Sequence, residues 1–99
     1  MSELDIIKQK ITENKPYLKA TYGVEEIGVF GSLARGDNNE NSDIDISIEL
    51  NQKVPVGLFE FASLQFYLED LLGKKVDLVI KSGIKPLIKK NILSQLIII

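Results

Sequence analysis

Two aspartates separated by one apolar residue, Asp43-Ile44-Asp45, are the feature of this sequence that says most about its chemistry. Side chains of an extended strand alternate between two faces, whereas a helix would rotate the second carboxylate away from the first. The alternation continues beyond Asp45, with isoleucines on one face and Ser47 and Glu49 on the other. Burial of the apolar face therefore turns the aspartates, Ser47 and Glu49 outward.

A third aspartate, Asp77, alternates with Val76 and Leu78 in a second predicted strand over residues 75–80. Three clustered carboxylates repel one another unless cations neutralise them. The chain has no histidine and no cysteine, so metal ligands would be oxygen atoms, which Mg²⁺ prefers. Two such ions about 4 Å apart can activate an attacking hydroxyl and stabilise a leaving oxygen in phosphoryl or nucleotidyl transfer.

A predicted strand over residues 24–30 ends at Gly31, and Ser32 begins a short turn or helix. Backbone N–H groups and a hydroxyl at such a corner can bind phosphate oxygens. The polar segment 36–42 is rich in turn-forming residues and predicts an exposed loop leading to Asp43. The loop can bring the anion-binding corner and the aspartates to the same end of the sheet.

Each motif also has a purely structural explanation. Asp43 and Asp45 could be ordinary solvent-facing residues of an edge strand, and Asp77 a surface carboxylate. Gly31 could serve only the turn and Ser32 only a helix cap. Any one motif alone favours these explanations, whereas their combination favours a catalytic site.

The segments Gly31–Gly36 and Ser42–Ile46, with Val76–Val79 downstream, resemble the minimal nucleotidyltransferase branch of the DNA polymerase beta superfamily. The resemblance spans nearly the whole chain. It agrees with an α/β (α+β) fold in which helices flank a short mixed β-sheet. Arg35 matches the motif, where it would bind phosphate or brace the loop.

The resemblance also implies a role for each of the other motif residues. Asp43 and Asp45 would bind two Mg²⁺ ions, and Asp77 would complete the carboxylate triad and help to activate the incoming hydroxyl. Gly31 and Ser32 would hold the nucleoside triphosphate. The implied reaction is attack of an acceptor hydroxyl on the α phosphate, with pyrophosphate leaving.

Stand-alone proteins of this size resemble antitoxins encoded beside HEPN-domain toxins, which implies transfer of AMP from ATP to a toxin tyrosine. We therefore expect a cognate HEPN toxin as partner, and a domain too small to enclose a substrate agrees with this. Two alternatives stay open. The acceptor could be a small hydroxylated molecule such as an aminoglycoside, or the chain could be a non-catalytic antitoxin that acts by occlusion. Base preference and oligomeric state have no signature in the sequence.

The N-terminal region predicts helix. Ser2 can cap a helix whose apolar residues recur at helical spacing. Pro16 predicts a break near residues 14–15 and a second helical piece over residues 16–22. Tyr17 and Leu18 are expected to pack inward from that piece.

The C-terminal half predicts two more helices. Residues 56–72 carry apolar stripes that include Phe59 and Phe66 and are assigned to the core. Pro86 begins a last helix, followed by an apolar tail over residues 96–99 that is either an internal strand or a surface covered by another chain. A basic cluster around this helix is either a solvated face or a means of steering nucleotide or an acidic partner; it comprises Lys81, Lys85, Lys89 and Lys90.

Length and composition limit the remaining possibilities. The 99 residues, 44% of them hydrophobic, predict a single domain over residues 1–99, and the resemblance implies that it is a minimal nucleotidyltransferase domain. A net charge of −2 argues against stable binding to nucleic acid. The N-terminus lacks the pattern of a secretory signal, and no apolar run approaches the roughly 20 residues of a membrane span, so we expect a cytoplasmic protein.

Overall fold

A four-stranded mixed sheet forms the centre of the protein. The structure, a computed structural model, describes residues 1–99. β1 (Val24–Phe30) pairs antiparallel with β2 (Ile44–Leu50) and with β4 (Ile97–Ile98), whereas β2 pairs parallel with β3 (Val76–Ile80). The spatial order is β3-β2-β1-β4. The parallel pair requires a crossover between β2 and β3, and this crossover contains a helix.

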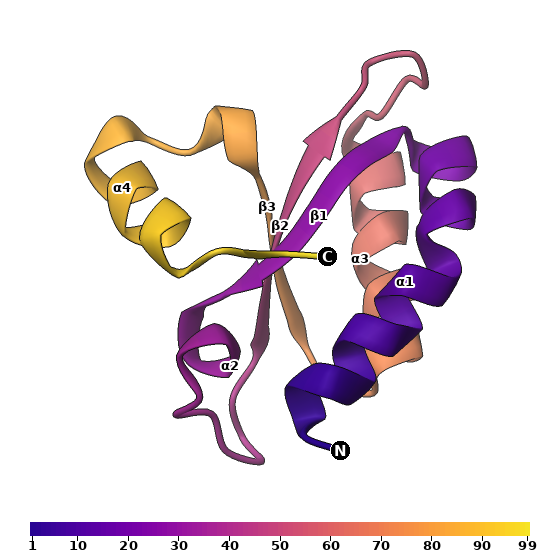
Figure 1. Ribbon diagram of the computed structural model, residues 1–99. Coiled ribbons are helices and arrows are strands. Elements are labelled where there is room, and N and C mark those ends of the chain that lie inside the picture. The colour runs from indigo at the N-terminus through magenta and orange to yellow at the C-terminus, as the bar shows by residue number, and fades with distance from the viewer.

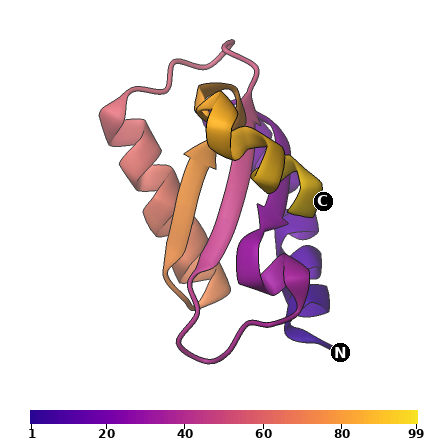
Figure 2. The same ribbon diagram turned by 90° about the vertical axis from the view of Figure 1, so that its left-hand side faces the viewer.

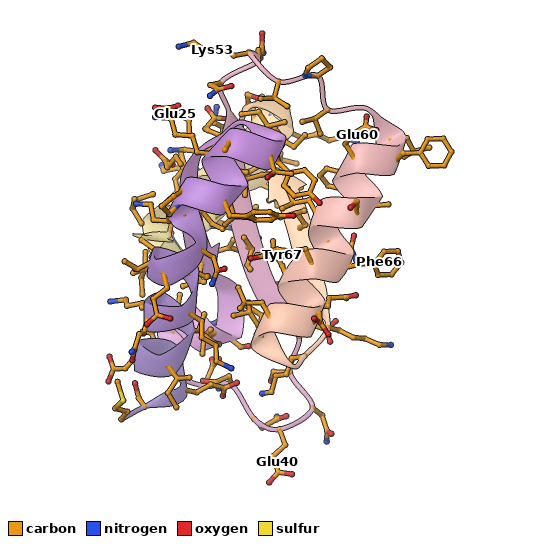
Figure 3. All side chains as sticks on the ribbon, turned by 90° about the vertical axis from the view of Figure 1, so that its right-hand side faces the viewer. Glu25, Glu40, Lys53, Glu60, Phe66 and Tyr67 are labelled. Carbon is orange, nitrogen blue, oxygen red and sulfur yellow. The ribbon has the colours of Figure 1, made fainter.

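Helices lie on both faces of this sheet. α1 (Glu3–Tyr22) and α3 (Leu58–Leu72) cover one face side by side, as Figure 3 shows from outside. α2 (Gly31–Arg35) and α4 (Pro86–Gln95) lie on the opposite face, and a 3₁₀ turn, η1 (Lys81–Gly83), leads from β3 to α4 (Figure 1, Figure 2). This arrangement confirms the predicted fold class.

The hydrophobic core lies between the sheet and the layer formed by α1 and α3. Ile44, Ile46 and Ile48 of β2 are almost completely buried, as the alternation predicted, in one cluster with Ile11 of α1 and Leu64 of α3. Burying one such side chain contributes about 1.5–3 kcal/mol. A shift of β2 by one residue would expose all three isoleucines, so the core fixes which face carries the aspartates.

Ser47 departs from the expected exposure. It lies on the same face of β2 as Asp45, yet it is only 2% exposed and its Oγ has no hydrogen-bond partner. Gly28, its neighbour across the sheet, lies against the C-terminal segment, because a Cβ at Gly28 would be 2.7 Å from the carbonyl oxygen of Ile97. The C-terminal segment therefore closes over the middle of the polar face.

The predicted break at Pro16 is wrong, because α1 runs without interruption through it. A proline inside a helix removes one backbone hydrogen bond. Contacts with α3 offset that loss: the Tyr67 hydroxyl donates to Asn14 Oδ1 at 2.6 Å, and the rings of Tyr17 and Tyr67 lie 4.8 Å apart between centroids. Leu18, in the turn after the proline, is fully buried as predicted.

Three aromatic side chains that were expected in the core lie outside it. Tyr17 is 46% exposed, although its ring contacts Tyr67. Phe59 is 87% and Phe66 69% exposed, and Figure 3 shows Phe66 pointing away from the molecule. The fully buried residues of α3 form one stripe of Leu64, Leu68 and Leu72. Phe61, Tyr67 and Leu71 are partly buried and pack against the same core.

The apolar C-terminal tail is an internal strand. Ile97 and Ile98 pair with Val29 and Gly28 of β1, and the Ile99 N–H donates to the carbonyl of Ile27 at 2.9 Å. This outcome confirms the first of the two predicted possibilities for the tail. None of the helices combines the length and the apolar character that a membrane span requires.

Candidate active site

Asp45 and Asp77 face each other across the parallel pair β2 and β3. They are register partners on adjacent strands, so their side chains leave the sheet on the same face. Asp43 lies one residue before β2. Asp45 is half-buried, whereas Asp43 and Asp77 are exposed. The structure thus brings Asp45 and Asp77 together. Asp43 lies at the exposed end of the loop that leads into β2.

The electrostatic environment of Asp45 is unfavourable for its charged form. Burial is the largest cause that raises the pKa of Asp45 above the usual value of 3.8, and the charges of Asp77 and Asp43 raise that pKa further. A side-chain hydrogen bond with Asp77 acts in the same direction, whereas the charge of Arg35 lowers the pKa. The site therefore favours the binding of positive charge or of a proton.

The donor set at this edge consists of carboxylate oxygens, which suits Mg²⁺. No set of three acidic side chains converges closely enough to ligate a single ion. Asp45 and Asp77 are nevertheless adjacent, and the charge of Asp43 adds to their mutual repulsion, so a bound divalent cation would relieve that repulsion. The residues thus fit Mg²⁺ in chemistry, and their role as ligands remains a prediction.

Gly31 allows the backbone to approach the Asp45 carboxylate. Its φ of +72° lies in the left-handed region, and a Cβ at this position would collide with Asp45, lying 2.9 Å from its Cγ. α2 starts at Gly31, and no side chain caps its N-terminus. Half-buried Ser32 follows in the first turn of α2. The predicted phosphate-binding corner therefore lies directly against the predicted metal ligand.

Arg35 holds the loop and α4 together. Its Nε donates to Asp37 Oδ2 at 3.1 Å, and its Nη1 donates to Gln95 Oε1, at the end of α4, at 3.0 Å. Of the two predicted roles, this geometry favours bracing the loop. Gln95 was missed by the sequence analysis, since nothing in the residues around it points to an arginine 60 positions away.

The loop between α2 and β2 is also fixed to the start of α1. The Asn38 side-chain amide donates to Glu3 Oε2 at 2.6 Å, and the Lys74 ammonium lies 2.7 Å from Glu3 Oε1. Lys74 Nζ also donates to the carbonyl of Asn39 at 3.3 Å. These residues hold the segment that delivers Asp43 and Asp45, and sequence reasoning missed Glu3 and Lys74 in this role.

Residues 7–99 match the family model described as nucleotidyltransferase domain. The protein adenylyltransferase MntA of Thermococcus cleftensis is 43% identical over 98% of this chain and 96% of its own length. A candidate protein adenylyltransferase of Methanocaldococcus jannaschii is 44% identical over the full length of both chains.

Solved structures share the fold. A candidate minimal nucleotidyltransferase superposes with a TM-score of 0.75 at 32% identity, over 98% of this chain and 95% of its own. A tri-AMPylated HEPN toxin of Shewanella oneidensis in complex with MNT antitoxin gives a TM-score of 0.66 at 18% identity, over 93% of this chain and 70% of that one. This last likeness is one of fold alone. The chain therefore belongs to the nucleotidyltransferase domain family, as a nucleotidyltransferase of its minimal branch.

Proposed function

We propose that this chain transfers AMP from ATP to a tyrosine hydroxyl of a cognate HEPN toxin, in a reaction that depends on Mg²⁺. The observation that carries the proposal is the pairing of Asp45 with Asp77 beside the close approach of Gly31. The name of the Thermococcus cleftensis relative supports a protein as the acceptor. The AMPylated toxin in the complex with a similar fold supports a HEPN domain as the partner.

In this proposal the three aspartates have the task of binding metal ions, and Asp77 has the additional task of accepting a proton. Asp43 and Asp45 would hold two Mg²⁺ ions, and Asp77 would share in holding them from the neighbouring strand. When bound, the ions would supply positive charge that neutralises the phosphates and polarises the α phosphate. Gly31 and Ser32 present backbone N–H groups and a hydroxyl to the phosphates.

The exposed position of Asp77 suits an acceptor that arrives from a second protein. The acceptor oxygen forms a bond to the α phosphorus while the bond from that phosphorus to the bridging oxygen of the β phosphate breaks. Pyrophosphate leaves with the electron pair, and the hydroxyl proton passes to the Asp77 carboxylate. Arg35 contacts Asp37 and Gln95, so in this proposal it acts as a positioning residue.

The proposal can be tested with ATP labelled either at the α or at the γ phosphate. The chain, Mg²⁺ and the proposed cognate HEPN toxin are incubated with each label. We expect only the α label on the toxin, no transfer without Mg²⁺, and a loss of about 100-fold or more in the Asp45→Asn variant. Asp70→Asn, which changes an exposed aspartate of α3, is the matched control and should transfer normally.

Two outcomes would remove the proposal in different ways. If neither label reaches the toxin and the Asp45→Asn variant still suppresses toxicity, the chain acts by occlusion. If the α label appears on an aminoglycoside added to the same mixture but never on the toxin, the acceptor is a small molecule.

A further inference from the structure

The last helix leaves apolar side chains uncovered. None of the ten residues of α4 is buried; Leu87 is 96% exposed and Ile88 52%. A groove of about 480 Å³ runs along the helix, and Ile84, Ile88 and Ile92 line it from the α4 side. Phe61 and two residues of β3 form its other wall. An apolar surface of this kind on a small protein marks a place where another molecule binds.

Positive charge surrounds these apolar side chains. Lys85, Lys89 and Lys90 form no ion pair within the chain, unlike Lys81, which pairs with Glu26 at 2.8 Å. No aspartate or glutamate occurs after Asp77, so the C-terminal region is basic in a chain whose net charge is −2. We call the combined region the α4 surface; it comprises Ile84, Lys85, Leu87, Ile88, Lys89, Lys90 and Ile92.

The end of α4 adjoins the loop that leads into the candidate active site. α4 lies on the same face of the sheet as α2, which follows the Gly31 corner (Figure 2). The contact of Arg35 with Gln95 joins the end of α4 to the loop that leads to Asp43. A protein bound along α4 would therefore lie next to this loop.

The neighbouring edge of β3 is partly closed to an added strand. Ile44 N–H donates to the Lys75 carbonyl, so Val76 directs its own N–H and C=O away from β2. Both groups are already bonded to α3: Val76 N–H donates to Glu69 Oε2 at 3.0 Å, and its carbonyl accepts from Gln65 Nε2 at 3.2 Å. The surface thus favours a helix in the groove over strand addition.

We propose that the α4 surface binds an acidic amphipathic helix of the protein that receives AMP. This inference rests on the proposed function and specifies the surface that binds the proposed toxin. Apolar side chains of the partner helix would fill the groove, and its carboxylates would meet Lys85, Lys89 and Lys90. The leucine and isoleucine side chains favour a protein partner over RNA, which would need stacking or polar groups.

A second copy of this chain is the competing occupant. The outer side of α3 exposes Leu58, Phe59 and Phe66 beside Glu60 and Asp70, which would complement α4 in charge. A contact between the α4 surface of one copy and the outer side of α3 of the next joins two different surfaces. It therefore adds copy after copy to a fibre, unless the copies close into a ring. Self-association is therefore an outcome that the experiment must detect.

The test measures binding of the proposed cognate HEPN toxin, without ATP, so that chemistry plays no part. We expect Leu87→Asp and the double variant Lys89→Glu, Lys90→Glu each to weaken binding by about tenfold or more. Phe59→Asp, at an apolar residue of α3 that is 87% exposed, is the matched control and should bind as the wild type does. Because Leu87 is almost fully exposed, its replacement should leave the melting temperature unchanged.

Several results would overturn the inference. The wild type could fail to bind the toxin, the α4 variants could bind as tightly as the wild type, or Phe59→Asp could weaken binding equally. Dimers or fibres of the chain alone that Leu87→Asp abolishes would assign the surface to a second copy. Binding of labelled RNA that needs the lysines but not Leu87 would assign it to nucleic acid. If the variants lose binding as expected and the wild type transfers no AMP, only the proposed function fails.

Discussion

Asp45 is half-buried between two other carboxylates, and this position links its charge to the stability of the fold. Because its pKa is raised in the folded state, the folded protein binds a proton more tightly than the unfolded chain does. Stability therefore falls as pH rises from the usual aspartate value of 3.8 through the raised pKa. Above that interval the loss is complete and constant.

Replacing Asp45 by Asn removes this repulsion. We predict that Asp45→Asn melts at the same or a higher temperature than the wild type at pH 7, and that any gain shrinks at about pH 3, where the wild-type carboxyl is protonated. Thermal melting of both proteins at the two pH values checks the prediction. The prediction would be contradicted if the melting temperature of the variant minus that of the wild type were smaller at pH 7 than at pH 3.

Mg²⁺ should relieve the same repulsion without any substitution. We predict that Mg²⁺ raises the melting temperature of the wild type, since a cation that binds only the folded state stabilises it. The same Mg²⁺ concentration should have little effect on Asp45→Asn, and a chelator should reverse the wild-type shift. Equal shifts for wild type and variant would place the ion elsewhere.

The glycine at position 31 is needed for two separate reasons, which can be measured apart. Gly31 and Gly36 both have positive φ, so Ala costs about 1–2 kcal/mol of backbone strain at either position. Only Gly31 faces the Asp45 carboxylate, whereas a Cβ at Gly36 meets nothing within 4 Å. We predict that Gly31→Ala lowers the free energy of unfolding by about 1–3 kcal/mol more than Gly36→Ala does. Denaturant unfolding of both variants gives the difference, and equal losses would contradict the close approach.

At the scale of elements, β4 fixes the position of α4 and hence of the loop that Arg35 braces. The chain crosses the sheet at Gly28, where a Cβ would lie 2.7 Å from the Ile97 carbonyl oxygen and 2.9 Å from Leu96 Cδ1. This crossing leads directly from Gln95, the α4 partner of Arg35. The last residues of the chain therefore support the site although they lie outside it.

Adding a methyl group at Gly28 should displace this crossing. We predict that Gly28→Ala lowers the free energy of unfolding by about 1–3 kcal/mol and speeds hydrogen exchange of the Ile99 amide, which donates to Ile27. Gly83→Ala is the matched control, because a Cβ at Gly83 meets nothing within 4 Å. An unchanged Ile99 amide in Gly28→Ala would show that β4 does not depend on this glycine.

The sequence predicted those elements whose pattern is local. β1 has the predicted bounds, and the isoleucines of β2 are buried as their alternation indicated. The prediction at Pro16 failed because local propensity was outweighed by contacts from α3, which lies far along the chain. Phe59 and Phe66 were assigned to the core because an exposed aromatic residue has the same local pattern as a buried one.

In the candidate site, too, features with a local sequence pattern could be predicted, whereas contacts between distant segments could not. The register of β2 and β3 brings Asp45 and Asp77 together, as two outward-facing aspartates on neighbouring strands allow. The contact of Arg35 with Gln95 and that of Glu3 with Lys74 could not be predicted, because each joins side chains from distant segments and needs the tertiary fold. No regular spacing of residues in a sequence marks side-chain contacts of this kind.

At the scale of the whole molecule, the fold is a thin layer with one well-covered face. Its principal extents are 35 × 31 × 19 Å, and the buried core lies on the side of α1 and α3. The opposite face carries α2 and α4 (Figure 1). Asp45 and Asp77 leave the sheet on that face, and Asp43 and Asp77 are exposed. A nucleotide bound there would stay open to solvent on one side, and in our proposal the toxin closes that side and supplies the hydroxyl.

The most direct measurement is the intact mass of the cognate HEPN toxin that we propose as the partner, after incubation with the chain, ATP and Mg²⁺. We predict a mass increase equal to one or more AMP groups, located on tyrosine by peptide sequencing, and no increase when Asp45→Asn replaces the wild type. A toxin whose mass stays unchanged while it remains bound to the wild-type chain would contradict the central claim.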